Sequence, residues 1–130
     1  MVQENGINYI CNWAIEADRS VTETVLRDGT VGIANHAFDY LSSLTSVVIP
    51  EGVVTMGDWT FSNCKSLTSV SIPASVQSIS RYTFYACPNL TYIHYAGTKA
   101  EWYALEKESG WDSDMATYTV HCTDGDIAKS

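Results

Sequence analysis

Three phenylalanines, Phe38, Phe61 and Phe84, stand 23 residues apart, and the sequence around each of them repeats at the same interval. A fixed period in the twenties is typical of solenoids, in which each unit buries its apolar face only against its neighbours. We therefore expect one domain with three full repeats over residues 31–99. Residues 1–30 would form an N-terminal cap with a degenerate repeat, and residues 100–130 a C-terminal cap.

Each repeat divides into two halves. In the second repeat, residues 67–72 alternate and are rich in β-branched side chains, which predicts a strand with Leu67, Val70 and Ile72 pointing inward. The apolar residues of the other half follow no strand or helix period, so that half predicts a return path that carries the phenylalanine into the core. Stacked copies predict a β-rich, right-handed solenoid with a parallel sheet on one side and a phenylalanine ladder on the other.

The repeat pattern resembles a known family. The spacing Cys64-x-x-Leu67-x-x-Val70-x-Ile72, followed by Phe84, and the phrase FSNCKSLTSVSIP are similar to the BspA-like, treponemal class of leucine-rich repeat. The resemblance is close over residues 31–99 and weaker upstream. It implies a leucine-rich-repeat fold in a bacterial surface or secreted protein that uses its repeats for adhesion.

Both ends carry cap signals. In the N-terminal segment alternate residues are apolar, which predicts one half-buried strand; these residues are Ile7, Tyr9, Cys11, Trp13 and Ile15. At the other end, Thr98 and Glu101 match a capping box and predict a helix over residues 99–107, with Trp102 and Leu105 covering the last rung. Residues 116–122 should form a final edge strand, and residues 124–130 a frayed tail.

The charge and the hydropathy of the chain argue against nucleic acid and membranes as its partners. The net charge of −8 and the pI near 4.6 argue against nucleic acid and anionic membranes, which attract basic surfaces. The apolar runs are too short to span a bilayer, so we expect no membrane insertion. Residues 1–5 lack the features of a signal peptide, so the chain is expected to be either cytoplasmic or a piece of a longer secreted or surface precursor.

Cysteines and histidines show no pattern of a metal or catalytic site. Cys64 and Cys87 occupy equivalent positions where the first repeat has Leu41, which predicts buried, reduced thiols. The spacings contain no zinc motif, so no metal or cofactor is expected. The three histidines lie in different parts of the chain. Their separation gives no sign of a catalytic group, and an enzyme that uses a histidine at the sheet edge is only a weak alternative.

The outward face of the parallel sheet is the candidate binding surface. Residues between the inward ones point outward: Glu23, Val25, Arg27, Ser46, Val48, Pro50, Ser69, Ser71, Pro73, Tyr92, His94 and Ala96. Aromatic groups beside small hydroxyls suit protein or glycan recognition. The candidate binding residues are Ser46, Val48, Ser69, Ser71, Tyr92 and His94. Two alternatives stay open: Tyr92 shields the last rung, or the chain is a structural spacer within a larger protein.

Overall fold

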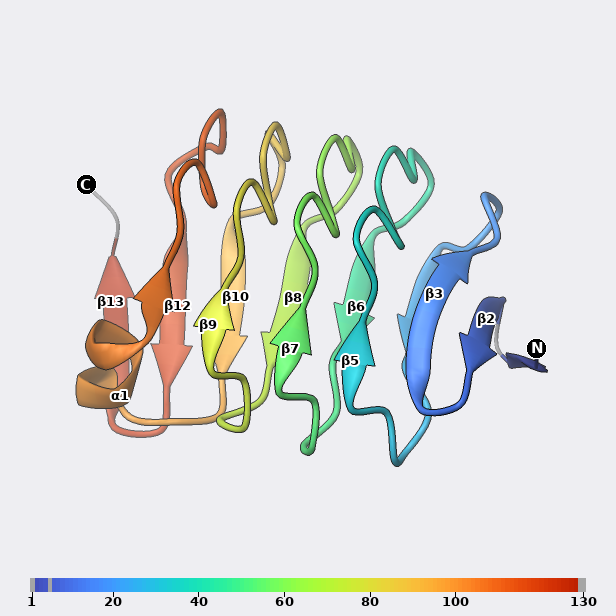
Figure 1. Cartoon of the computed structure of the whole chain (residues 1–130). Coiled ribbons are helices and arrows are strands. Elements are labelled where there is room, and N and C mark those ends of the chain that lie inside the picture. The colour runs from blue at the N-terminus through green and yellow to red at the C-terminus, as the bar shows by residue number, and fades with distance from the viewer. Residues whose placement is uncertain (1, 5, 129–130) are drawn as a thin grey trace.

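The computed structural model describes residues 2–4 and 6–128. The chain winds into a flattened coil of about five turns, with strands on two opposite sides and turns above and below them (Figure 1). This confirms the predicted solenoid. The coil has more turns than the three predicted repeats because strands of both end segments also join the stack.

One side of the coil is a six-stranded sheet. Its strands, in spatial order, are β4 (Glu23–Val25), β6 (Ser46–Val48), β8 (Ser69–Ile72), β10 (Tyr92–Tyr95), β12 (Thr119–Cys122) and β13 (Gly125–Ala128). The first five are parallel, and β13 runs antiparallel to β12. From β4 to β10 each residue pairs with the one 23 positions later, as Ser46 does with Ser69. Neighbouring strands therefore come from consecutive repeats.

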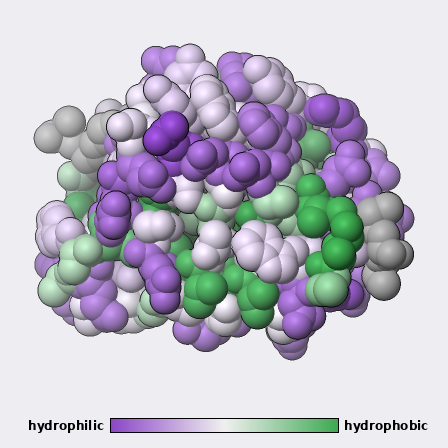
Figure 2. All heavy atoms as spheres, in the orientation of Figure 1, coloured by the Kyte–Doolittle hydropathy of each residue, from purple (hydrophilic) through white to green (hydrophobic). Residues whose placement is uncertain are grey.

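The other side is built from shorter return strands. Its sheet consists of β1 (Val2–Glu4), β2 (Ile7–Ile10), β3 (Trp13–Ala17), β5 (Gly32–Ile33) and β7 (Thr55–Met56), and beyond it β9 (Ser78–Ile79) pairs with β11 (Glu106–Lys107). Figure 2 views this side: hydrophilic residues gather over the turns at the top, and hydrophobic patches lie below them. Val31 and Val54, which precede β5 and β7, are among its exposed apolar residues.

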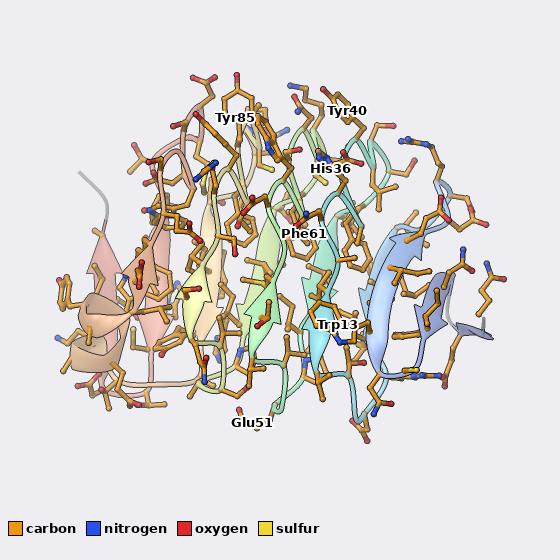
Figure 3. The ribbon with its side chains drawn as sticks, in the orientation of Figure 1. Trp13, His36, Tyr40, Glu51, Phe61 and Tyr85 are labelled. Carbon is orange, nitrogen blue, oxygen red and sulfur yellow. The ribbon has the colours of Figure 1, made fainter. Side chains whose placement is uncertain are left out.

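Phenylalanines stack through the core between the two sides. The rings of Phe38 and Phe61 are 5.0 Å apart and nearly parallel, and those of Phe61 and Phe84 are 5.5 Å apart. All three side chains are fully buried, and Figure 3 shows Phe61 inside the coil. Trp111 meets the end of the ladder edge-on, 6.4 Å from Phe84. The predicted ladder is thus confirmed, and a tryptophan extends it.

The two repeated cysteines are buried, free thiols, as predicted. Cys64 Sγ donates to the carbonyl of Phe38, and Cys87 Sγ donates to that of Phe61, both at 3.0 Å. Contact with the Cys87 thiol and burial raise the pKa of the Cys64 thiol. These thiols therefore satisfy core carbonyls, and burial keeps both of them from contact with solvent.

The N-terminal prediction of one continuous strand is wrong. The chain reverses at Cys11, whose φ of 52° lies in the left-handed region, and β2 and β3 pair antiparallel. Because of this reversal Ala14 and Ala17 are buried, whereas Cys11 and Trp13 are exposed. The resulting hairpin, extended by β1, covers the edge of the return sheet through the pairing of β3 with β5.

The C-terminal cap differs from the prediction in three ways. Helix α1 (Lys99–Ala104) has the predicted capping box between Thr98 and Glu101 but ends early, because the next residues extend to pair as β11 with β9. Residues 119–122 form β12, which is not an edge strand, because β13 covers it. Residues 125–128 of the predicted frayed tail are that strand, while residues 129–130 lie outside the described part. Trp102 is buried and Leu105 half-buried, as a cover for the last rung requires.

Candidate functional site

The open face of the six-stranded sheet carries two straight rows of side chains. Pairing places one residue of each strand in each row, and parallel pairing keeps the rows in register from rung to rung. The first row is Glu23, Ser46, Ser69, Tyr92, Thr119 and Ala128. The second row is Val25, Val48, Ser71, His94, His121 and Asp126. All six predicted binding residues lie on this one face.

Exposure along the face varies with side-chain size. Ser46, Ser69 and Ser71 are half-buried among their neighbours, and Val48 and His94 are exposed. Tyr92 keeps 41% of its surface exposed. Of the other residues predicted to point outward, Pro73 is buried, because the chain is already turning away from the sheet there. The middle of the face is therefore a shallow, uncharged floor of hydroxyls.

An aromatic and imidazole cluster stands at the C-terminal end of this floor. The ring of Tyr92 stacks on that of His121 with centroids 4.0 Å apart, and it is nearly parallel to the ring of His94 at 6.2 Å. His121 Nδ1 lies 2.8 Å from a carboxylate oxygen of Asp126 on β13. The contacts hold the rings in fixed orientations, so the cluster presents both apolar area and hydrogen-bonding groups without further ordering.

Sequence reasoning missed His121 and Asp126 as members of this face. His121 pairs with His94, but it lies 27 residues later because helix α1 lengthens the last turn of the coil beyond the repeat period. The alternating residues 118–122 were a signal that this segment is a strand. The strand that pairs with this segment could not be identified by counting in steps of 23, because the spacing here is 27.

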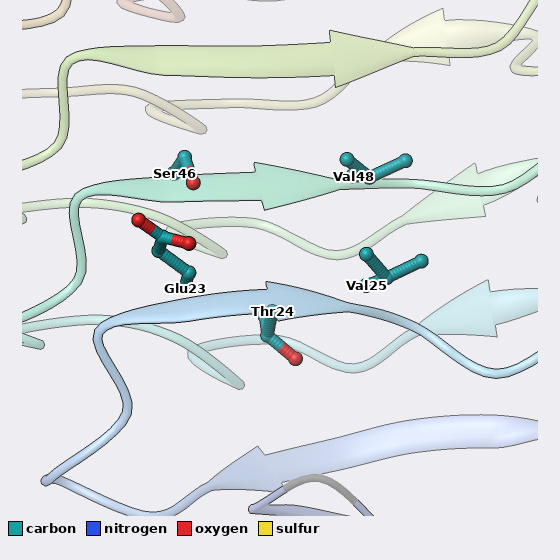
Figure 4. Close-up of a pocket in the computed structure, with 5 residues that line it drawn as sticks. All are labelled: Glu23, Thr24, Val25, Ser46 and Val48. Carbon is teal, nitrogen blue, oxygen red and sulfur yellow. The ribbon is translucent and has the colours of Figure 1, made fainter.

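A hollow of about 530 Å³ opens at the N-terminal end of the same sheet, beside β4. Figure 4 shows its lining residues, Glu23, Thr24 and Val25 from β4 and Ser46 and Val48 from β6. Two of the predicted binding residues, Ser46 and Val48, belong to it. It differs chemically from the other end of the face, because its lining has two exposed valines and no aromatic ring.

A second aromatic row runs along the turns. His36, Trp59 and Tyr82 occupy equivalent positions with φ between 55° and 61°, and their rings stack with centroid distances of 6.1 and 4.4 Å. Tyr85 packs edge-on against both Trp59 and Tyr82, and in Figure 3 it projects from the turns. The stacked rings cover one another's faces, so this row mainly locks adjacent turns together.

The described residues show no group of three or more His, Cys, Asp or Glu side chains placed to hold a metal ion. Likewise, no helix in residues 2–4 and 6–128 is long and apolar enough to cross a membrane. Burial, followed by the nearby Asp112 carboxylate, raises the pKa of Tyr118, whose hydroxyl donates to Asp112 at 3.0 Å. This pair lies in the C-terminal cap, so it contributes to closing the coil.

Comparisons with known proteins place the chain in a family. Two solved structures are similar to this chain, each with 23% sequence identity. The first is a leucine-rich cell surface protein from Faecalibacterium prausnitzii A2-165, and the match covers 75% of this chain and 38% of that chain with a TM-score of 0.42. The second is a leucine-rich repeat protein from Bacteroides ovatus ATCC 8483, and the match covers 60% of this chain and 33% of that chain with a TM-score of 0.36. The chain thus spans 38% or less of the length of each of these two proteins. No curated protein matches it. The profile of the BspA-type leucine-rich repeat region matches residues 4–107 in six copies, so the chain belongs to the BspA-type leucine-rich repeat family.

Proposed function

We propose that this chain is a noncatalytic repeat module that binds a protein or glycan through the open face of its six-stranded sheet. The observation that carries the proposal is the registered face itself, with the cluster of Tyr92, His94 and His121 at one end. Rigid strands hold these side chains in place, so binding would lose little conformational entropy. The return side, by contrast, has strands of only two residues beyond its N-terminal hairpin.

The chemistry of the face limits the ligand. Tyr92 provides apolar area with a polar tip, the kind of side chain that tends to carry binding energy. The hydroxyls of Ser69 and Ser71 offer hydrogen bonds on the flat floor beside it. Such a surface suits a sugar or the polar rim of a protein, and we propose a secreted or cell-surface location for it. The location rests on the BspA-type family resemblance.

The test begins with a screen of the purified chain on arrays of glycans and extracellular-matrix proteins. For each hit, affinity is compared between wild type and Tyr92→Ala/His94→Ala, with Tyr82→Ala as a matched control that removes an aromatic ring from the turns. The double variant should weaken binding at least tenfold, and the control should leave it unchanged. Equal affinities in a folded double variant would contradict the proposal, and absence of any hit would favour a structural spacer in a larger protein.

A further inference from the structure

The two ends of the six-stranded sheet are built differently, although each finishes in a strand with one unpaired edge among the described residues. At the C-terminal end, the antiparallel strand β13 pairs with β12 at all four of its positions. At the N-terminal end, the β1–β3 segment extends the return sheet instead. In the part of the chain that the structure describes, no strand pairs with the outer edge of β4. This end of the sheet is therefore an open strand edge.

The main chain of β4 offers hydrogen-bonding groups at this edge. Leu26 N–H donates to the carbonyl of Val48 at 3.2 Å, so Leu26 faces β6. Successive residues of a parallel strand direct their main-chain groups to alternate sides. Thr24 therefore faces β6 as well, and Glu23 and Val25 direct their N–H and C=O groups outward.

Arg27 is the next residue that directs its main-chain groups outward, and its N–H has a partner in the N-terminal cap. Arg27 N–H donates to the hydroxyl of Tyr9 at 3.0 Å, so the N-terminal hairpin supplies a partner there. The guanidinium of Arg27 also lies 4.1 Å from the centre of the Tyr9 ring, which fixes the hairpin against this end of the strand. The cap thus supplies a partner at residue 27, whereas no hydrogen bond among the described residues occupies the outward main-chain groups of Glu23 and Val25.

The hollow at this end wraps around the strand edge. Glu23 and Val25 lie on one face of β4, and Thr24 lies on the opposite face, yet all three line the hollow (Figure 4). Thr24 is only 6% exposed, and its hydroxyl has no hydrogen-bond partner among the described residues. A buried hydroxyl without a partner is costly, so this end of the sheet leaves a polar side chain unsatisfied beside its open strand edge.

We infer that the outer edge of β4 is an acceptor for an added β-strand, supplied by a basic, extended segment of another polypeptide. Pairing would satisfy the main-chain groups of Glu23 and Val25, as in other cases of strand addition. A lysine or arginine opposite Glu23 would meet the only charged side chain that lines the hollow among the described residues. An aliphatic residue two positions later would pack against Val25, which is 54% exposed.

The charge of the chain decides against a second copy as the occupant. At −8, two copies repel each other, whereas a basic segment is attracted. The orientation is expected to be parallel, because this continues the ladder of the four strands that follow β4. The inference goes beyond the binding role proposed above, since it concerns the opposite end of the sheet and main-chain recognition.

The test uses a capped seven-residue peptide of threonines with lysine third and isoleucine fifth, titrated into the isotopically labelled chain. Nuclear magnetic resonance should show shifts of the Glu23 and Val25 amides, whose hydrogen exchange slows on binding, while Tyr92 and His94 stay unperturbed. Replacing the lysine by glutamate, or methylating the peptide nitrogens that face β4, should abolish these changes. Unchanged binding of the methylated peptide would overturn the inference.

Two variants separate main-chain from side-chain recognition. Val25→Pro removes the outward N–H, and the bonds from Thr24 and Leu26 to β6 remain, so affinity for the peptide should fall about tenfold. Val25→Ala keeps the N–H and should weaken binding by about threefold at most. Equal effects of the two variants would contradict strand addition. A dimer of the free chain with these amides already protected would instead assign the edge to a second copy.

Discussion

Truncation of the central ring of the phenylalanine ladder is the sharpest test of the packing. Phe61 is fully buried, with Phe38 stacked on one side at 5.0 Å and Phe84 on the other at 5.5 Å. Replacing it by alanine leaves a ring-sized cavity between the two neighbouring rings. The expected loss in the free energy of unfolding is about 3–5 kcal/mol, a large share of the stability of a small domain.

The same change at the ends of the ladder should cost less, in a defined order. Phe38 has one stacked ring neighbour, whereas Phe84 also meets Trp111 edge-on at 6.4 Å. Since an aromatic pair contributes about 0.5–1.5 kcal/mol beyond its burial, Phe38→Ala should be milder than Phe61→Ala by roughly 1 kcal/mol, with Phe84→Ala between them.

Urea unfolding followed by circular dichroism measures these differences, and the dependence on denaturant should stay the same across the three variants. Phe61→Leu is the control, because it keeps most of the volume and removes only the ring stacking. A loss at Phe61 equal to or smaller than the loss at Phe38 would refute the ladder as the centre of the core.

Three further outcomes follow from the packing of individual residues. Cys64 and Cys87 should react with a thiol reagent only after unfolding, and a mass lower by two hydrogens with neither of these two thiols reactive in the unfolded chain would contradict the reduced state. Thr24→Val should raise the free energy of unfolding by about 1 kcal/mol, because it removes a hydroxyl that has no partner among the described residues. Thr83→Val should lower it by a similar amount, because that hydroxyl donates to a carbonyl at 2.7 Å, and calorimetry would show the opposite signs. Gly57→Ala places a methyl group 2.4 Å from a backbone nitrogen of the preceding turn and should cost about 1–3 kcal/mol, so an unchanged melting temperature would argue against this close approach.

Sequence reasoning was sufficient where the repeat period holds. The inward positions of Val47, Val70 and Ile93 and the phenylalanine ladder all follow from a spacing of 23, because each rung repeats the environment of the last. The outward positions followed from the same alternation, which is why the six predicted binding residues share one face. The solenoid and most of the candidate surface were therefore predictable.

The ends were less predictable because their constraints come from packing. The reversal at Cys11 uses a left-handed backbone without an Asn-Gly or Asp-Gly signal, and alternating apolar residues on both sides concealed it. Helix α1 could have continued by its local preferences, but pairing of Glu106 and Lys107 with β9 required extended backbone. The longer last turn then placed His121 beside Tyr92, a contact that the sequence period did not indicate.

The most direct test of the proposed binding face is a map of amide chemical-shift changes in the labelled chain, recorded with a ligand identified on the arrays. The account predicts that the changes cluster along the open face, at Ser46, Val48, Ser69, Ser71, Tyr92 and His94. His121 should respond as well, because its ring stacks on Tyr92. Changes confined to the turns that carry His36, Trp59 and Tyr82, with the sheet face silent, would contradict it.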